Sequence, residues 1–209
     1  MHTAHFLNGG KLVNPILIDR IQDSEGKTIF NNEKRYCENC DQISYNGTKD
    51  PIIKNKYVQI FSPQTAYQIT SMLKGVIERG TGKGLKDLKV ELAGKTGTTN
   101  KNTDTWFIGF TSNLVIGVYI GYDNPKSLGK FETGSKTAMP VFKEFIKKTA
   151  NTDNARPFKV ADNIKMMVVD AKTGKKANSK TKQAIIESFK TLNIKSDSLY
   201  ENIDSRLNS

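Results

Sequence analysis

The residues best suited to chemistry lie in one short segment, Gly94-Lys95-Thr96-Gly97-Thr98-Thr99, which ends an apolar stretch. An apolar stretch of this length predicts a strand. On the edge of a strand, the Lys95 ammonium, the hydroxyls of Thr96 and Thr98 and a backbone N–H left accessible by Gly97 suit an anionic acyl substrate. The segment therefore predicts a binding site for an anionic acyl substrate.

Neighbouring segments predict the sheet that holds these residues. Two runs rich in β-branched and aromatic residues, 105–111 and 114–122, are separated only by Ser112-Asn113. Such a short separation predicts a hairpin, so the 94–99 segment is expected to head an antiparallel sheet. We therefore expect an α+β fold, an antiparallel sheet with packed helices.

Two helices are predicted to pack near this sheet. Ser62-Pro63 predicts the start of the first helix and Gly80 its end. Pro140 predicts the start of the second. Their apolar stripes contain Ala66, Ile69, Leu73, Val76 and Ile77 in the first helix, and Val141, Phe142, Phe145 and Ile146 in the second.

The remaining segments carry weaker patterns. Residues 16–21 and 28–30 predict a hairpin, and the polar stretch 31–56 predicts an insertion loop. Past residue 150 the pattern predicts one short strand at 166–169 and a basic, weakly ordered tail over 175–209. We therefore divide the chain into residues 1–150 and a C-terminal extension, 151–209.

Charge and hydropathy narrow the classes of partner. The net charge is +11, but it comes from 27 Lys and only 5 Arg spread along the chain. This distribution favours a solvated surface over a nucleic-acid groove, so no nucleic acid is expected. No run of about 18 apolar residues is present and the first residues do not resemble a signal peptide, so no membrane segment is expected.

The two cysteines form one Cys37-x-x-Cys40 motif. A zinc site needs two further ligands, and the two histidines, His2 and His5, lie at the N-terminus. A disulfide between Cys37 and Cys40 is therefore favoured over zinc, which stays the alternative. We expect no metal and no cofactor.

Five sets of residues carry a resemblance to a known family. They are Asn8-Gly9-Gly10-Lys11, Arg79-Gly80-Thr81-Gly82, Gly94–Thr99, Asp104-Thr105-Trp106-Phe107 and Gly121-Tyr122-Asp123-Asn124. Over about residues 5–175, the chain resembles the C-terminal part of the transpeptidase domain of class A penicillin-binding proteins, the bifunctional peptidoglycan synthases. The resemblance implies an incomplete penicillin-binding-protein/β-lactamase-like fold.

The family's activity is D,D-transpeptidation, a transferase reaction of cell-wall synthesis that penicillins block. By resemblance, Lys95 supplies positive charge and assists proton transfer, while the backbone N–H of Thr98 forms half of the oxyanion hole. The hydroxyls of Thr96 and Thr98 would bind the substrate carboxylate, and Gly97 would let the substrate backbone approach. The implied partners are a peptidoglycan stem peptide or a β-lactam.

The chain departs from the family in its nucleophile. The family's Ser-x-x-Lys and Ser-x-Asn motifs belong upstream of Asn8, so we expect a fragment that does not acylate alone. Similar patterns at Ser71–Lys74, Ser127–Lys130, Ser179–Lys182 and Ser44–Asn46 are rejected from their context. Ser71, for example, is expected on the solvated back of its helix, opposite the apolar stripe.

Three functional hypotheses stay open. The chain is an inactive part of a transpeptidase, or it complements a separately made N-terminal half, or it is a non-catalytic basic protein that binds anionic polymers. By resemblance, the synthase works at the periplasmic face of the inner membrane. Because helices that would cover its sheet are expected to be missing, the chain alone should be marginally stable.

Overall fold

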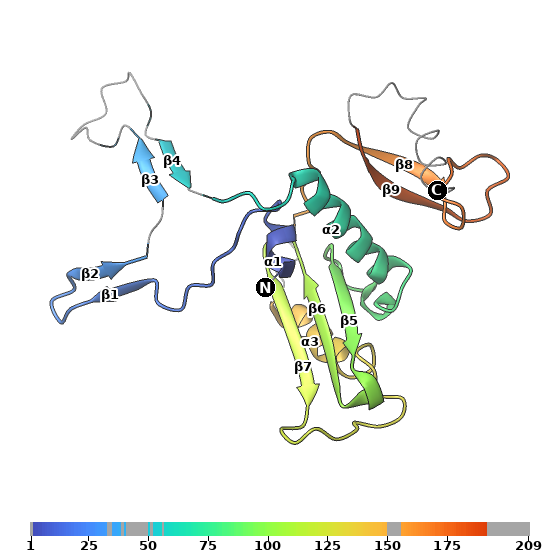
Figure 1. Cartoon of the computed structure of the whole chain (residues 1–209), viewed down its shortest axis with the longest axis horizontal. Coiled ribbons are helices and arrows are strands. Elements are labelled where there is room, and N and C mark those ends of the chain that lie inside the picture. Colours follow the sequence, from blue (N-terminus) through green and yellow to red (C-terminus); the bar gives the residue numbers. More distant parts are fainter. Residues whose placement is uncertain are drawn as a thin grey trace. The chain divides into compact units, whose positions relative to one another are not determined.

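The structure is a computed structural model that describes residues 2–32, 35–38, 40, 50, 52–55, 57–149 and 156–191 (Figure 1). The chain forms two compact units, one of Lys11–Ile60 and one of Met1–Gly10 with Phe61–Ser209. The candidate strand belongs to the larger unit. The predicted boundary between residues 1–150 and the C-terminal extension stays a prediction, because the two compact units divide the chain at other positions.

A three-stranded antiparallel sheet is the centre of the larger unit (Figure 1). Its strands are β5 (Ala93–Thr98), β6 (Asp104–Phe110) and β7 (Val115–Gly121), in the order β5-β6-β7. The sheet and the β6–β7 hairpin confirm the predicted arrangement. Within the described part of the chain β5 pairs with β6 only, so its outer edge is open.

Helix α3 (Ala138–Thr149) packs on one face of this sheet. The buried rings of Phe107 and Phe142 lie 4.8 Å apart, centroid to centroid. A Cβ at Gly109 would come within 2.7 Å of the Phe142 ring, so the close approach of the helix requires glycine there. The helix begins two residues before Pro140, the predicted start, because proline fits anywhere in a first turn, where N–H groups lack intrahelical partners.

Helix α2 (Pro63–Glu78) begins where the sequence predicts. The Ser62 hydroxyl accepts a hydrogen bond from the Thr65 amide (3.2 Å), an N-cap. The buried face differs from the predicted stripe: Thr70 is buried among the apolar residues, while Ile69 and Val76 are only half-buried. Burial of Thr70 is tolerated because its hydroxyl donates to the Ala66 carbonyl (3.0 Å).

In the described part of the chain, the opposite face of the sheet is covered at one end only. Ala93, Phe110 and Phe158 form a buried cluster there, joined by side chains of α2 and of the short helix α1 (His2–Leu7). At the other end the rings of Trp106 and Tyr119 are in tilted contact, with centroids 4.8 Å apart, yet the two residues remain 41% and 51% exposed. This exposed aromatic pair agrees with the expectation of an incompletely covered sheet.

Glu91 joins three segments of the larger unit. One carboxylate oxygen accepts from Lys74 of α2, and the other accepts from the Phe158 amide (2.6 Å). Burial disfavours the charged form of Lys74, but the hydrogen bond and charge of Glu91 outweigh this and raise the pKa of Lys74. Lys74 is therefore held as a structural cation.

The C-terminal extension contains a hairpin where the sequence predicted one strand. Strands β8 (Ile164–Asp170) and β9 (Ala184–Lys190) are antiparallel, and β9 lies in the stretch predicted to be weakly ordered. That prediction was wrong for residues 184–190, because β8 supplies a partner that a local pattern cannot reveal. β9 contacts α2: the Gln68 side chain donates to the Ser188 carbonyl (3.1 Å). Residues 192–209 lie outside the described residues.

The described residues of the smaller unit contain two hairpins. β1 (Arg20–Gln22) and β2 (Thr28–Asn31) form the predicted one, with β1 slightly later than expected. β3 (Arg35–Glu38) and β4 (Ile52–Asn55) form a second hairpin inside the stretch predicted to be a loop. The loop prediction was wrong at these eight positions, where short β-forming runs such as Ile52-Ile53 are flanked by polar residues.

Candidate active-site strand

The open edge of β5 carries the polar groups predicted to bind substrate. The Thr99 amide donates to the carbonyl of Asp104 (3.1 Å), the residue next to β5's last partner. Because amides alternate between the two edges of a strand, the N–H groups of Thr96 and Thr98 are directed away from β6. The predicted oxyanion-hole donor, the Thr98 N–H, is thus at the accessible edge.

The Lys95 ammonium lies at this same edge. Its Nζ donates to the Thr96 carbonyl (2.8 Å), which shares the outward direction of the Thr96 amide. Lys95 is exposed, and no carboxylate neutralises it among the ion pairs of the described residues. The edge therefore combines one cation with two backbone donors, a combination suited to an anionic or carbonyl oxygen.

The Thr96 side chain has a partner that sequence reasoning did not assign to the site. Its hydroxyl lies 3.1 Å from the hydroxyl of Thr81, which follows α2. One of the two must donate to the other, so Thr81 orients the Thr96 hydroxyl. The signal for Thr81 was its place in the Arg79-Gly80-Thr81-Gly82 motif.

The Thr98 hydroxyl contacts the loop that precedes α3. It accepts a hydrogen bond from the Gly134 amide (3.1 Å). A hydroxyl that accepts one bond can still donate its own hydrogen. The role of the Thr98 hydroxyl in binding a carboxylate stays a prediction. The hydrogen bond from the Gly134 amide holds the Thr98 hydroxyl oxygen in place.

Gly134 also touches the backbone of the site. A Cβ at Gly134 would lie 2.4 Å from the Trp106 carbonyl oxygen and 2.7 Å from that of Gly97. Both contacts are to backbone atoms of paired strands, which cannot move aside cheaply. Gly97 was predicted to admit substrate; the structure shows that the protein's own loop approaches it as well.

Gly134→Ala is expected to lower the free energy of unfolding by about 1–3 kcal/mol, because the added methyl group separates the loop from β5 and β6. Chemical denaturation measures this, and amide chemical shifts of Thr98 report the local change. Gly117→Ala is the matched control, since its Cβ would meet only Ile108 Cγ1 at 4.0 Å. Equal effects of the two substitutions would contradict the packing argument.

The structure describes three of the four rejected serine patterns, and their rejection as nucleophiles stays a prediction. Ser71 is half-buried rather than fully exposed as predicted, but the ammonium of Lys74 pairs with Glu91 and Glu78. The Ser127 hydroxyl accepts from the Gly129 amide (3.2 Å) in an exposed loop, and Ser179 is exposed in a turn. Ser44–Asn46 lies outside the described residues.

Cys37 and Cys40 are joined as a disulfide, with Cα atoms 5.7 Å apart. Among the described residues no three His, Cys, Asp or Glu side chains are grouped as metal ligands would be. In the same residues no helix has both the length and the apolar character needed to cross a membrane.

Residues 2–147 match the family model described as the penicillin binding protein transpeptidase domain. The chain is 41% identical to penicillin-binding protein 1A of Rickettsia felis over 209 residues, which are 99% of this chain and 26% of that protein. It is 31% identical to penicillin-binding protein 1A of Pseudomonas aeruginosa, covering 88% of this chain and 26% of that protein. The chain thus spans about a quarter of the length of these relatives.

A solved structure shows the same fold. The crystal structure of penicillin-binding protein 1A from Haemophilus influenzae superposes with a TM-score of 0.73 at 32% identity. The superposition covers 90% of this chain and 31% of that one.

Proposed function

Because this chain belongs to the penicillin-binding protein transpeptidase family, we propose that its β5 edge binds the acyl end of a peptidoglycan stem peptide during D,D-transpeptidation. β-Lactams would occupy the same edge. The observation that carries the proposal is the convergence at this edge of the Lys95 ammonium and the outward amides of Thr96 and Thr98.

The proposed chemistry assigns each group a step. A serine oxygen bonds to the carbonyl carbon of the penultimate D-Ala, and the Thr98 N–H stabilises the negative charge that develops on the carbonyl oxygen. The terminal D-Ala then leaves as an amine after accepting a proton, which Lys95 assists. An amine of a neighbouring peptide later displaces the serine oxygen. The Thr96 hydroxyl, oriented by Thr81, binds the terminal carboxylate.

We propose that the nucleophile is none of the candidate serines in the described residues and that another part of the same synthase supplies it. The 209 residues alone are then a substrate-binding piece that is inactive until it meets a segment with Ser-x-x-Lys and Ser-x-Asn. From its family we also propose that the working enzyme acts at the periplasmic face of the inner membrane.

The test is intact-mass spectrometry after incubation with labelled penicillin. We expect no adduct on the 209-residue chain alone. After co-expression with the preceding transpeptidase segment of the Rickettsia felis relative, we expect one adduct per complex, on a serine of that segment. A stoichiometric adduct on Ser71, or on any other serine of this chain, would contradict the proposal.

A further inference from the structure

We propose that the Phe131 loop, residues 128–136, forms a subsite next to Thr98 for a carboxylate-bearing part of the peptide substrate, and that Asn102 positions it. This inference rests on the proposed function, because it extends the ligand of the β5 edge by a second contact. The subsite lies beyond the groups that would hold the reacting carbonyl.

Hydrogen bonds hold both ends of the Phe131 loop near the end of β5. The Asn102 side-chain amide donates to the carbonyls of Glu132 (2.6 Å) and Lys130 (3.4 Å), and the Asn102 carbonyl accepts from the Leu128 amide (2.8 Å). Further along, the Gly134 amide donates to the Thr98 hydroxyl (3.1 Å). Hydrogen bonds therefore hold the Phe131 loop against the end of β5 and the turn that follows it.

The turn that carries Asn102 has an uncommon backbone. Lys101 and Asn102 have φ angles of +62° and +53°, in the left-handed region that non-glycine residues rarely adopt. The Thr99 hydroxyl braces the turn by accepting from the Asp104 amide (2.9 Å). Asparagine adopts this region more readily than most residues, and the Asn102 side chain also makes the contacts to the loop.

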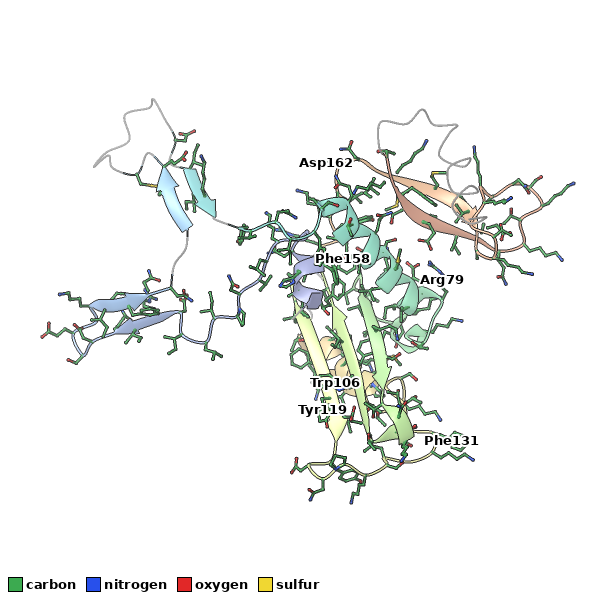
Figure 2. All side chains as sticks on the ribbon, viewed as in Figure 1. Arg79, Trp106, Tyr119, Phe131, Phe158 and Asp162 are labelled. Carbon is green, nitrogen blue, oxygen red and sulfur yellow. A yellow bond between two sulfur atoms is a disulfide. The ribbon has the colours of Figure 1, made fainter. Side chains whose placement is uncertain are left out.

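The loop presents an exposed aromatic ring with two cations near it. Phe131, which is labelled in Figure 2, is 68% exposed. The ammonium groups of Lys130 and Lys136 lie 5.7 Å and 5.6 Å from its ring centroid. Both lysines are exposed, so their remaining N–H donors face solvent. An exposed ring with two cations within 6 Å of it suits a ligand that carries a carboxylate on an apolar stem.

The loop and the adjoining turn carry three lysines against one glutamate, an excess of positive charge that favours an anionic ligand. Glu132, in the same loop, is half-buried, while Lys101 is exposed on the adjoining turn. Lys126 lies over a different ring, Tyr122, at 4.1 Å from its centroid. Two cations beside one ring fit a single carboxylate, whereas an extended polyanion would need a longer row of contacts.

The test compares two synthetic peptides, acetyl-glutamyl-D-alanyl-D-alanine and its glutaminyl counterpart, which differ in one negative charge. The dissociation constants for the isotope-labelled chain are measured from amide chemical shifts. We expect the glutamyl peptide to bind about three- to tenfold more tightly, as an exposed pair of charge contacts allows. Lys130→Gln combined with Lys136→Gln should abolish this preference, and Lys126→Gln should leave it unchanged.

Two further variants complete the test. Asn102→Asp tests whether Asn102 positions the loop, and Thr96→Val tests the proposed function independently of the subsite. Aspartate at 102 can adopt the same φ but has no side-chain N–H to donate to the loop. Asn102→Asp should therefore abolish the preference for the glutamyl peptide, although residue 102 does not contact the peptide in this proposal. Thr96→Val should weaken both peptides equally. Equal affinity of both peptides, with Thr96→Val still weakening them, would overturn the subsite alone. An equal loss of preference in Lys126→Gln would also overturn it, and absence of binding by both peptides would overturn the proposed function and the subsite together.

Discussion

Lys95→Ala should slow β-lactam acylation at least about a hundredfold in a complex that supplies the nucleophilic serine. The substitution removes the ammonium that donates to the Thr96 carbonyl at the open edge of β5. It deletes both a positive charge near the developing negative charge and an aid to proton transfer, each of which contributes about 10²-fold or more in enzymes. The measurement is the second-order rate of acylation by a fluorescent penicillin.

Lys126→Ala is the matched control, because Lys126 is an exposed lysine of the same unit that lies over Tyr122 rather than at β5. We expect its acylation rate to stay within about twofold of the unmodified complex. Thermal unfolding of each complex separates a loss of chemistry from a loss of structure. If Lys95→Ala acylates at the unmodified rate, β5 does not line the active site.

Phe142→Ala should produce the largest loss of stability, about 3–5 kcal/mol. The Phe142 ring is fully buried between Phe107 and the backbone at Gly109, and a cavity would remain because paired strands cannot collapse into it. Urea-induced unfolding monitored by circular dichroism gives the free energy of unfolding.

Phe145→Ala, on the same helix, is the control for Phe142→Ala. Phe145 is 45% exposed, so we expect its removal to cost less than about 1.5 kcal/mol. Phe142→Leu is a milder change, and its loss in the free energy of unfolding should lie between those of Phe142→Ala and Phe145→Ala. It gives a measurable transition if Phe142→Ala leaves too little folded protein. Similar losses for Phe142 and Phe145 would mean that α3 does not pack on the sheet as described.

The central sheet was predictable because its signals are local. β6 and β7 are joined by a short turn, and their β-forming residues are contiguous, so the hairpin follows from neighbouring residues alone. β9 was missed because its lysine-rich surroundings resemble a disordered tail and because its pairing depends on β8. The β3–β4 hairpin was missed for a similar reason, since a polar stretch of 13 residues separates its two short strands.

The candidate site was predictable only along β5. The order of Lys95, Thr96 and Thr98 on one strand follows from the sequence, and so does the alternation of their amides. The contacts of Thr96 with Thr81 and of Thr98 with Gly134 join residues 15 and 36 positions apart. Such contacts depend on how α2 and the loop before α3 return to the sheet, which no local pattern specifies.

The open edge of β5 also bears on how the protein behaves at high concentration. An unpaired strand edge is a template for any extended chain, including β5 of a second copy. Each copy carries a net charge of +11 and an exposed Lys95 on this strand, so like-charge repulsion opposes the pairing of two copies in dilute salt. Salt reduces the range of this repulsion to about 8 Å at an ionic strength of 0.15 M. Self-association should therefore grow with ionic strength, and a peptide bound along β5 should suppress it.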